Sequence, residues 1–258
     1  MPPDSVLAYA AALTQELQQA SDGLVQAAYL HGSAALGGWL PSSDVDILFI
    51  AADDISAATL EMVARSLADE GRLCPGRGLE CSVVSRSAAG VARPPWPFLL
   101  HVATGPTEPG GSRIHLGANS PGDPDLLMHY AVCRAAGWPV FGPPPQEIIG
   151  PVGRPDILDH LAAELRWGLE HAPEAYAVLN TCRALIYLAD GELVSKVAGG
   201  EAAMRRGLGP AVLIRRALAQ QEGRAPEQRP GPEAAAFALA TATALKDAAL
   251  EEAAGGSG

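Results

Sequence analysis

The sequence predicts an α+β protein in two parts: a small mixed sheet flanked by helices in residues 1–150, then an α-helical bundle in residues 151–254. Two observations support this prediction. Segments typical of helices and strands alternate through the first part, as they do in sheets covered by helices. In the second part the periodic segments carry apolar residues at three-four spacing, which is typical of helices that pack together. The last residues, 255–258, predict a flexible tail.

The individual elements follow from apolar spacing and capping residues. Leu7, Ala10, Leu13 and Leu17 recur at helical spacing. Ser56 is a suitable N-cap for the second long helix. In chain order we expect a helix over 5–20, strands over 25–30 and 45–51, a helix over 56–70, a strand over 79–84 and a helix over 125–136. The four helices of the second part are expected over 156–170, 174–189, 211–221 and 233–252.

Two Pro/Gly-rich segments are less informative about secondary structure. Residues 86–123 predict no clear element, although Trp96 within them is expected to pack rather than to line a pocket. Residues 139–145 contain the run Gly-Pro-Pro-Pro and predict a connection between the two parts.

Composition excludes several classes of function. A formal net charge of −11 argues against nucleic-acid binding, which needs basic patches. No apolar run is long enough to span a membrane, and the N-terminus lacks the basic and apolar regions of a signal peptide, so a cytoplasmic location is expected. The four cysteines are widely scattered, which predicts reduced thiols rather than disulfides or a zinc site. A monomer is expected.

The most informative segment is a glycine-serine turn followed by two carboxylates. Gly32 and Ser33 follow one predicted strand, and Asp44 and Asp46 begin the next. Residues two apart on a strand point to the same side, and two adjacent carboxylates stay ionised when a cation such as Mg²⁺ lies between them. Gly32 lets the backbone approach a phosphate, and Ser33 offers a hydroxyl and an N–H. The pattern predicts a metal-and-triphosphate site; the alternative is a surface turn with two solvated aspartates.

This pattern resembles the signature of the nucleotidyltransferase superfamily related to DNA polymerase β. The wider match resembles the adenylyltransferases that act on streptomycin and spectinomycin, and it comprises His31-Gly32-Ser33-Ala34, Gly37-Gly38, Pro41 and Ser43-Asp44-x-Asp46. A second segment, Leu79-Glu80-x-x-Val83-Val84, is similar to the family segment whose glutamate is the catalytic base. On its residues alone, Glu80 is equally an ordinary glutamate at a strand end.

The resemblance implies an enzyme that transfers AMP from ATP to a hydroxyl of an aminoglycoside or aminocyclitol antibiotic and so confers resistance. It implies a nucleotidyltransferase domain followed by a helical domain. Asp44 and Asp46 are expected to hold two Mg²⁺ ions, and Glu80 is expected to take the proton of the acceptor hydroxyl. The residues expected to contact the nucleotide are Gly32, Ser33, Ser43 and Asp125.

Two cations of the second part complete the expected nucleotide site. Arg183, in Asn180-Thr181-Cys182-Arg183, and Lys196, in Val194-Ser195-Lys196, lie at the separation found in the same adenylyltransferases, where they bind the triphosphate. A planar arginine fork and a mobile lysine charge suit phosphate oxygens. Without the upstream pattern, both would be ordinary surface cations.

The substrate is the least determined feature. The acidic, tryptophan-containing stretch that helps form the antibiotic pocket of the relatives is not recognisable here. Glu80, Glu170, Glu174 and Tyr176 are the expected substrate contacts, because a polycation needs acids and aromatic faces; both glutamates between 169 and 176 could instead be solvated helix ends. The segment 169–176 is short and lacks a tryptophan, so spectinomycin is expected ahead of streptomycin.

Other functions remain open from the sequence. They are a lincosamide nucleotidyltransferase, a protein-modifying or small antitoxin-type nucleotidyltransferase, and a catalytically inactive homologue that binds nucleotide. Three intact acids argue against the inactive homologue, since loss of one is the simplest route to inactivity.

Overall fold

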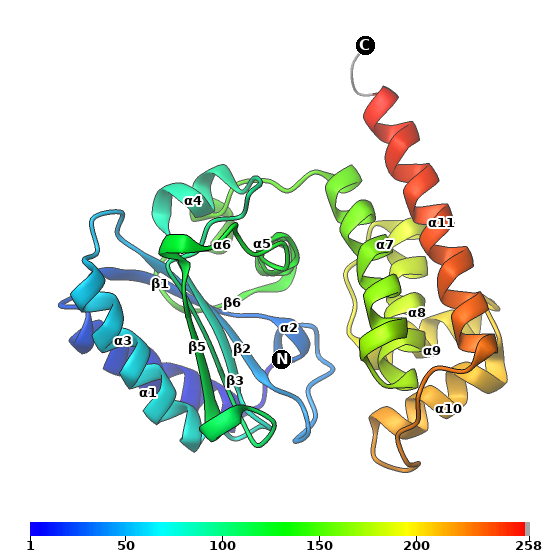
Figure 1. Cartoon of the computed structure of the whole chain (residues 1–258), viewed down its shortest axis with the longest axis horizontal. Coiled ribbons are helices and arrows are strands. Elements are labelled where there is room, and N and C mark those ends of the chain that lie inside the picture. Colours follow the sequence, from blue (N-terminus) through cyan, green and yellow to red (C-terminus); the bar gives the residue numbers. More distant parts are fainter. Residues whose placement is uncertain (256–258) are drawn as a thin grey trace. The chain divides into compact units, whose positions relative to one another are not determined.

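A computed structural model describes residues 1–255 and divides the chain into two compact units. Unit 1 comprises Met1–Val152 and contains the sheet, whereas the described part of unit 2, from Gly153 onward, is helical (Figure 1). The predicted α+β class is therefore confirmed. Gly255 is the last residue of the final helix. The rest of the predicted tail lies outside the described residues.

The sheet of unit 1 has six strands in the order β5-β4-β3-β2-β1-β6. Only β2 and β3 pair in parallel, and the other neighbours are antiparallel, so the sheet is mixed as predicted. The strands are β1 (Val25–Leu30), β2 (Val45–Ala51), β3 (Leu79–Ser85), β4 (Leu100–Thr104), β5 (Ser112–Leu116) and β6 (Trp138–Phe141).

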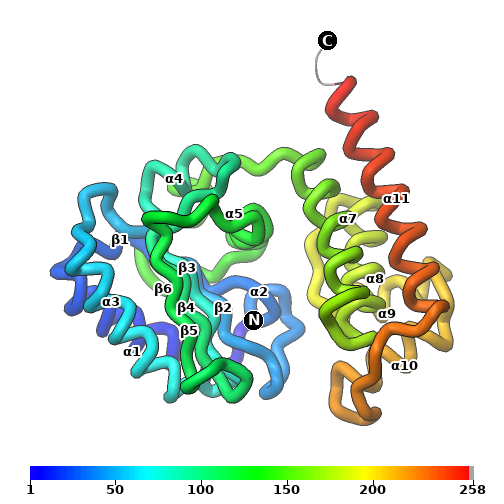
Figure 2. Tube along the Cα trace, in the orientation of Figure 1, coloured from blue at the N-terminus to red at the C-terminus, as the bar shows by residue number. Residues whose placement is uncertain are grey.

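Two long helices cover one face of this sheet, and shorter helices lie on the other. Figures 1 and 2 show α1 and α3 on one side and α5 on the opposite side. The helices of unit 1 are α1 (Asp4–Ala20), α2 (Gly32–Ala35), α3 (Ala57–Glu70), α4 (Arg86–Val91), α5 (Leu126–Ala136) and α6 (Pro145–Ile148). As predicted, Ser56 caps α3, because its hydroxyl accepts a hydrogen bond from the Thr59 N–H.

Strand alternation decides which face carries the core. Val45, Ile47 and Phe49 of β2 are buried in one cluster with the apolar faces of α1 and α3, including Leu13 and Leu67. Side chains alternate along a strand, so the residues between them point to the opposite face. This places Asp46 on the side of the sheet where α5 lies.

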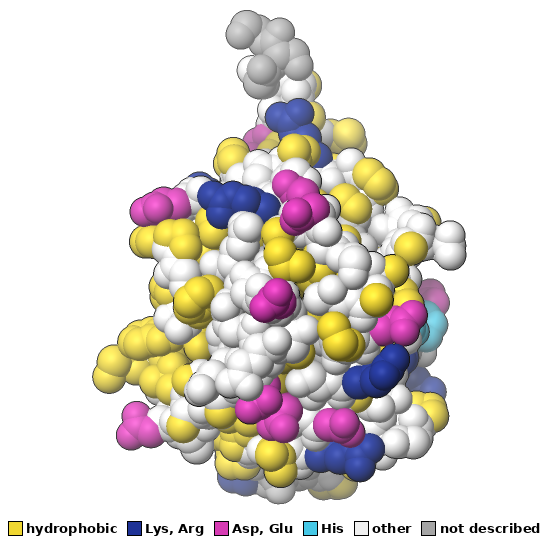
Figure 3. Space-filling view, turned by 90° about the vertical axis from the view of Figure 1, so that its left-hand side faces the viewer, with side chains coloured by type: hydrophobic (Ala, Val, Ile, Leu, Met, Phe, Trp, Pro, Cys, Tyr) yellow, Lys and Arg dark blue, Asp and Glu magenta, His cyan; other side chains and the backbone are white. Residues whose placement is uncertain are grey.

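The outer face over α1 and α3 carries acidic and basic side chains singly, among apolar and uncharged ones (Figure 3). Such mixing of both signs is what a solvated helix face requires. This face of unit 1 therefore presents charges of both signs to solvent.

Several elements differ from the sequence-based expectation. The Pro/Gly-rich residues 86–123 contain α4, β4 and β5, and the expected connection at 139–145 begins inside β6. The edge strand β5, Ser-Arg-Ile-His-Leu, is mostly exposed on both faces, so it lacks the alternation that marks a half-buried strand. Trp96 is buried and lies 6.2 Å from the Tyr130 ring, centroid to centroid, so it packs as expected.

Unit 2 is a helical bundle with its own apolar core. Its helices are α7 (Arg154–His171), α8 (Glu174–Asp190), α9 (Lys196–Arg206), α10 (Ala211–Gln221) and α11 (Pro232–Gly255). Leu179 and Cys182 of α8 pack against Leu213 and Ile214 of α10. Among these helices, α9 alone is absent from the expectation, because Gly199 and Gly200 lie in its first turns and glycine disfavours helix.

Other sequence-level expectations can be compared with the described residues. All four cysteines are free thiols. None of the helices in residues 1–255 combines the length and apolarity needed to cross a lipid bilayer.

Candidate active site

Two predicted acids are direct neighbours across the parallel strand pair. Asp46 of β2 is the register partner of Glu80 of β3. Register partners on adjacent parallel strands point to the same face of the sheet. Because that face is opposite the α1/α3 core, both carboxylates lie on the side facing α5. The sheet thus brings together two side chains that are 34 residues apart in the sequence.

The glycine of the Gly-Ser turn is required by Asp46. Gly32 has a φ of +57°, and a Cβ built on it would lie 1.9 Å from Asp46 Oδ2, far inside van der Waals contact. The neighbouring His31 N–H donates to the Asp46 carbonyl at 2.9 Å. Backbone and side chain of Asp46 are therefore both fixed by the turn, and only glycine leaves room for the carboxylate.

The two predicted serines differ in their environment. Ser33 Oγ is buried and has no hydrogen-bond partner among residues 1–255, so it can accept or donate a bond to a ligand. Ser43 Oγ instead accepts from the Leu40 N–H at 3.1 Å and shapes the loop before β2. Ser33 fits the predicted phosphate contact, and Ser43 has at least one structural role.

Asp44 is paired with a cation that the sequence patterns do not single out. Arg77 Nε donates to Asp44 Oδ1 at 3.1 Å, and Arg77 Nη2 donates to Oδ2 at 2.6 Å. This two-bond fork is the preferred geometry of arginine with carboxylates. Asp44 is therefore held by a positive group at the position where Mg²⁺ is expected.

Glu80 lines a cavity of about 290 Å³ within unit 1. Burial raises the pKa of Glu80, and the nearby Asp44 charge adds to this, while His101 and Arg113 oppose it. A carboxylate with a raised pKa is a stronger base than one in water. The other residues that line the cavity are mostly polar or charged: Phe98, His101, Arg113, His115, Ser120, Gly122, Asp123, Asp125 and His129.

Neutral histidines form part of this face. The His31 and His129 ring centroids lie 4.7 Å apart. Burial lowers the pKa of His31 well below its ordinary value, and the neighbouring His129 lowers it further. Burial also lowers the pKa of His101, whose Nδ1 lies 3.1 Å from Ser82 Oγ. Asp125 is the N-cap residue of α5 and lines the Glu80 cavity, so the structure brings this predicted nucleotide contact near Glu80.

Arg183 of unit 2, one of the two cations predicted to bind the triphosphate, is held by hydrogen bonds. Arg183 Nε donates to the Val194 carbonyl at 2.8 Å, and its Nη1 donates to Asn180 Oδ1 at 2.9 Å. Gly199 packs against the arginine, since a Cβ there would lie 2.9 Å from Arg183 Cγ. The presence of this glycine in α9 is thus explained: it allows the helix to approach the arginine stem.

Lys196, the other predicted cation, begins α9 and lies over an aromatic ring. Its Nζ is 4.3 Å from the centroid of Tyr176, within cation–π range. The Tyr176 hydroxyl donates to Glu164, and the half-exposed Trp167 packs edge-on against Tyr176 with the two ring centroids 5.8 Å apart. A tryptophan therefore does lie beside the predicted substrate tyrosine, although the segment 169–176 contains none.

Comparisons with known proteins match both parts of the chain to protein families. The family model "Aminoglycoside adenylyltransferase, C-terminal domain" matches residues 147–246, and the model "Nucleotidyltransferase domain" matches residues 11–71. The chain belongs to the aminoglycoside adenylyltransferases of the nucleotidyltransferase superfamily. Its fold is similar to a crystal structure of spectinomycin adenyltransferase AAD(9) from Enterococcus faecialis with ATP and spectinomycin. The TM-score is 0.62 and the identity 14%, over 92% of this chain and 97% of the other. No curated protein matches.

One predicted substrate residue of this adenylyltransferase has a different environment from the one expected. Glu174 is 1% exposed, and its oxygens accept from Arg216 at 2.7 and 2.9 Å and from Gln228 at 2.7 Å. A carboxylate engaged in this way has no free face for a ligand, so we correct its assignment to a structural ion pair. Glu170, by contrast, is exposed near the end of α7.

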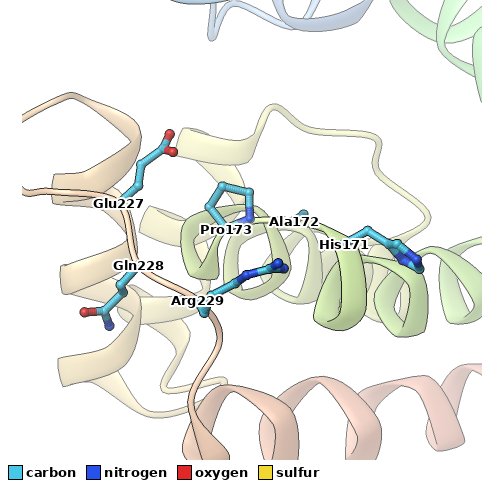
Figure 4. Close-up of a pocket in the computed structure, with 6 residues that line it drawn as sticks. All are labelled: His171, Ala172, Pro173, Glu227, Gln228 and Arg229. Atoms are coloured by element: carbon cyan, nitrogen blue, oxygen red, sulfur yellow. The ribbon is translucent and has the colours of Figure 1, made fainter. Parts of the chain in front are cut away.

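A second cavity of the adenylyltransferase, of about 430 Å³, lies in unit 2 near the α7–α8 turn (Figure 4). It is lined by His171, Ala172, Pro173, Glu227, Gln228 and Arg229. None of the predicted site residues lines it.

Sequence reasoning missed the partners of the predicted residues more than the residues themselves. Arg77 and Trp167 contact predicted site residues and His101 acts on the charge of Glu80, but these three belong to no recognised pattern. Asn180 stands in the recognised segment with Arg183, but no role was predicted for it. Asn180 offered a signal, because it stands three residues before Arg183 and such helical neighbours share a face. Arg77 offered none, since its contact depends on the β2–β3 register.

Proposed function

We propose that the protein transfers AMP from ATP to a hydroxyl of an aminocyclitol or aminoglycoside antibiotic, with spectinomycin as the first candidate. The observation that carries this proposal is the pairing of Asp46 with Glu80 on adjacent parallel strands, next to Asp44. It occurs in a chain whose second part matches the C-terminal domain of aminoglycoside adenylyltransferases. The neighbour that binds ATP and spectinomycin supports the choice of both substrates.

The donor set suits Mg²⁺ and a triphosphate. Asp44 and Asp46 provide the carboxylate oxygens that Mg²⁺ prefers, and the Ser33 hydroxyl, which bonds to no described residue, is available to a phosphate oxygen. We propose two ions at these aspartates, which when bound would neutralise the triphosphate and lower the pKa of the acceptor hydroxyl. Arg183 and Lys196 are proposed to contact phosphate oxygens, and Asp125 is proposed to contact the nucleotide.

Glu80 is proposed as the base. The acceptor oxygen would attack the α-phosphorus of ATP, the bond between the α- and β-phosphates would break, and pyrophosphate would leave with the bonding electrons. The proton of the acceptor hydroxyl would move to a Glu80 oxygen. The raised pKa of Glu80 suits this task, because a base works best when its pKa approaches the working pH.

The proposed substrate contacts are one exposed carboxylate and one partly buried aromatic ring. Glu170 is exposed and could pair with an ammonium group, and Tyr176 presents a ring in contact with Trp167. Aromatic faces and single carboxylates suit a small dicationic aminocyclitol.

The test is a direct assay of group transfer. Purified full-length protein is incubated with ATP, Mg²⁺ and one acceptor at a time: spectinomycin, streptomycin, other aminoglycosides and a lincosamide. We expect pyrophosphate release together with a product heavier than spectinomycin by one AMP. Asp46→Asn is the control, since it keeps the side-chain shape and removes the charge needed by the metal. Adenylylation of the lincosamide alone, or equal activity in the control, would reject the proposal.

A further inference from the structure

The fork between Arg77 and Asp44 uses both oxygens of a proposed metal carboxylate. The two donor–acceptor distances are 3.1 and 2.6 Å. Because the guanidinium spans both oxygens, a metal ion can bind Asp44 through both of them only after Arg77 leaves, and the positive charges of the two groups repel each other at this one carboxylate. The structure therefore contains a competition for a single carboxylate.

The backbone holds Arg77 in position to compete. The Arg77 N–H donates to the Ser43 carbonyl at 2.9 Å, and the Val45 N–H donates to the Gly78 carbonyl at 2.8 Å. These two bonds bracket Asp44 on either side. Gly76 allows the close approach, because a Cβ there would lie 2.3 Å from the Ser43 oxygen. The main chain of Arg77 is thus fixed beside Asp44, and only its side chain can move away.

The pair is accessible enough to be exchanged. The Arg77 side chain is 54% exposed and that of Asp44 24% exposed. An ion pair with this exposure is weakened by water and contributes little net stability, so a divalent cation can displace it at small cost. A guanidinium displaced from a carboxylate remains beside any phosphate that shares the metal, and phosphate is the other anion that fits the arginine fork.

We propose that Arg77 exchanges ligands during substrate binding: it neutralises Asp44 in the free enzyme and moves to the triphosphate when metal-nucleotide binds. The inference rests on the proposed function, because it takes Asp44 as a metal ligand. It makes Arg77 a positioning residue with two opposite effects. Arg77 weakens the binding of free metal and strengthens the binding of the metal-nucleotide complex.

The test measures both effects on the same variants. Binding of Mn²⁺ alone is followed by electron paramagnetic resonance, and binding of Mn²⁺ with α,β-methylene-ATP by calorimetry. Arg77→Gln and Arg77→Met remove the charge in two independent ways. Arg72→Gln is the matched control: it removes one positive charge nearby, and Arg72 is itself largely exposed and paired with Asp69. Melting temperatures check that each variant is folded.

In both Arg77 variants we expect Mn²⁺ alone to bind about two- to fivefold more tightly, the size of an exposed ion pair. We expect the metal-nucleotide complex to bind at least about threefold more weakly. Arg72→Gln should change neither affinity by as much as twofold. Changes in the same direction for both ligands, or an equal effect in Arg72→Gln, would overturn the exchange.

Failure of the exchange is distinguishable from failure of the proposed function. If wild-type protein binds neither Mn²⁺ nor the analogue, Asp44 is not a metal ligand and the proposed function itself fails. If wild-type protein binds both ligands and the Arg77 variants bind as it does, only the exchange is wrong.

Discussion

The Gly32 Cα and the Asp46 carboxylate are in direct contact, and any Cβ at position 32 would lie 1.9 Å from Oδ2. This contact links the Gly-Ser turn to the second aspartate of the predicted pattern. Gly32 therefore has a reason to be glycine that is independent of the triphosphate. It determines where the Asp46 carboxylate lies on the sheet.

The first prediction follows from this contact. Gly32→Ala should abolish turnover, because the new methyl group must push the Asp46 carboxylate out of position. Gly37→Ala is the control: Gly37 also has a positive φ, of +71°, but a Cβ added there would meet nothing within 4 Å. Both variants carry about 1–2 kcal/mol of backbone strain. Thermal unfolding should show similar destabilisation of the two variants. Pyrophosphate release should be lost only in Gly32→Ala.

The residues around this contact show which features of the site the sequence could predict. The spacing and chemistry of the residues pointed to Gly32 and Asp46, whereas the family resemblance pointed to Glu80. The register that pairs Asp46 with Glu80 depends on strand pairing, and sequence periodicity does not specify pairing. The edge strand β5 was missed because it is exposed and shows no apolar alternation. The neighbouring β4 is mostly buried, but it is short and lies within the Pro/Gly-rich residues 86–123.

The misassigned Glu174 illustrates another limit. A glutamate in the first turn of a helix is ordinarily solvated, and its negative charge interacts favourably with the helix dipole there. Here Arg216 and Gln228 reach it from segments more than 40 residues away, so its burial could not be foreseen from its own surroundings.

The second prediction tests Glu80 as the base. Glu80→Gln keeps the shape of the side chain but cannot accept a proton at neutral pH. Turnover should fall roughly 10²–10⁴-fold, the usual range for general acid–base catalysis. Calorimetry should show ATP binding little changed. Loss of ATP binding together with activity would make Glu80 a metal ligand.

The third prediction concerns stability and pH at the same residue. Burial raises the pKa of Glu80 in the folded protein, so the folded state favours the protonated form. The stabilising contribution of Glu80 is then present below its unfolded pKa and is lost as pH rises through the folded pKa. Glu80→Gln should therefore melt at a higher temperature than wild type at pH 7.5, and the difference should shrink toward pH 4. A lower melting temperature for the variant at pH 7.5 would contradict this expectation.

The fourth prediction concerns the support of Arg183. Asn180→Ala removes one of its two observed anchors while leaving the Val194 carbonyl in place. If Arg183 binds phosphate, the KM for ATP should rise several-fold with a smaller change in kcat. Gln220→Ala provides the control, since it truncates another buried amide of unit 2, on α10 rather than beside Arg183. Equal effects in the two variants would indicate general destabilisation instead.

The fifth prediction separates substrate contacts from structural charges in unit 2. Glu170→Ala and Tyr176→Phe should each weaken spectinomycin binding, measured with an unreactive ATP analogue, by about two- to tenfold. Removing Glu170 deletes an exposed charge, and removing the Tyr176 hydroxyl frees the ring from Glu164.

Glu174→Ala should behave differently: it leaves Arg216 unpaired and should lower the free energy of unfolding by about 1–3 kcal/mol. Below its melting temperature, Glu174→Ala should bind spectinomycin as wild type does. Specific loss of binding in Glu174→Ala, with Glu170→Ala and Tyr176→Phe unchanged, would restore Glu174 as the substrate acid. Streptomycin modified in preference to spectinomycin would reject the expected substrate order.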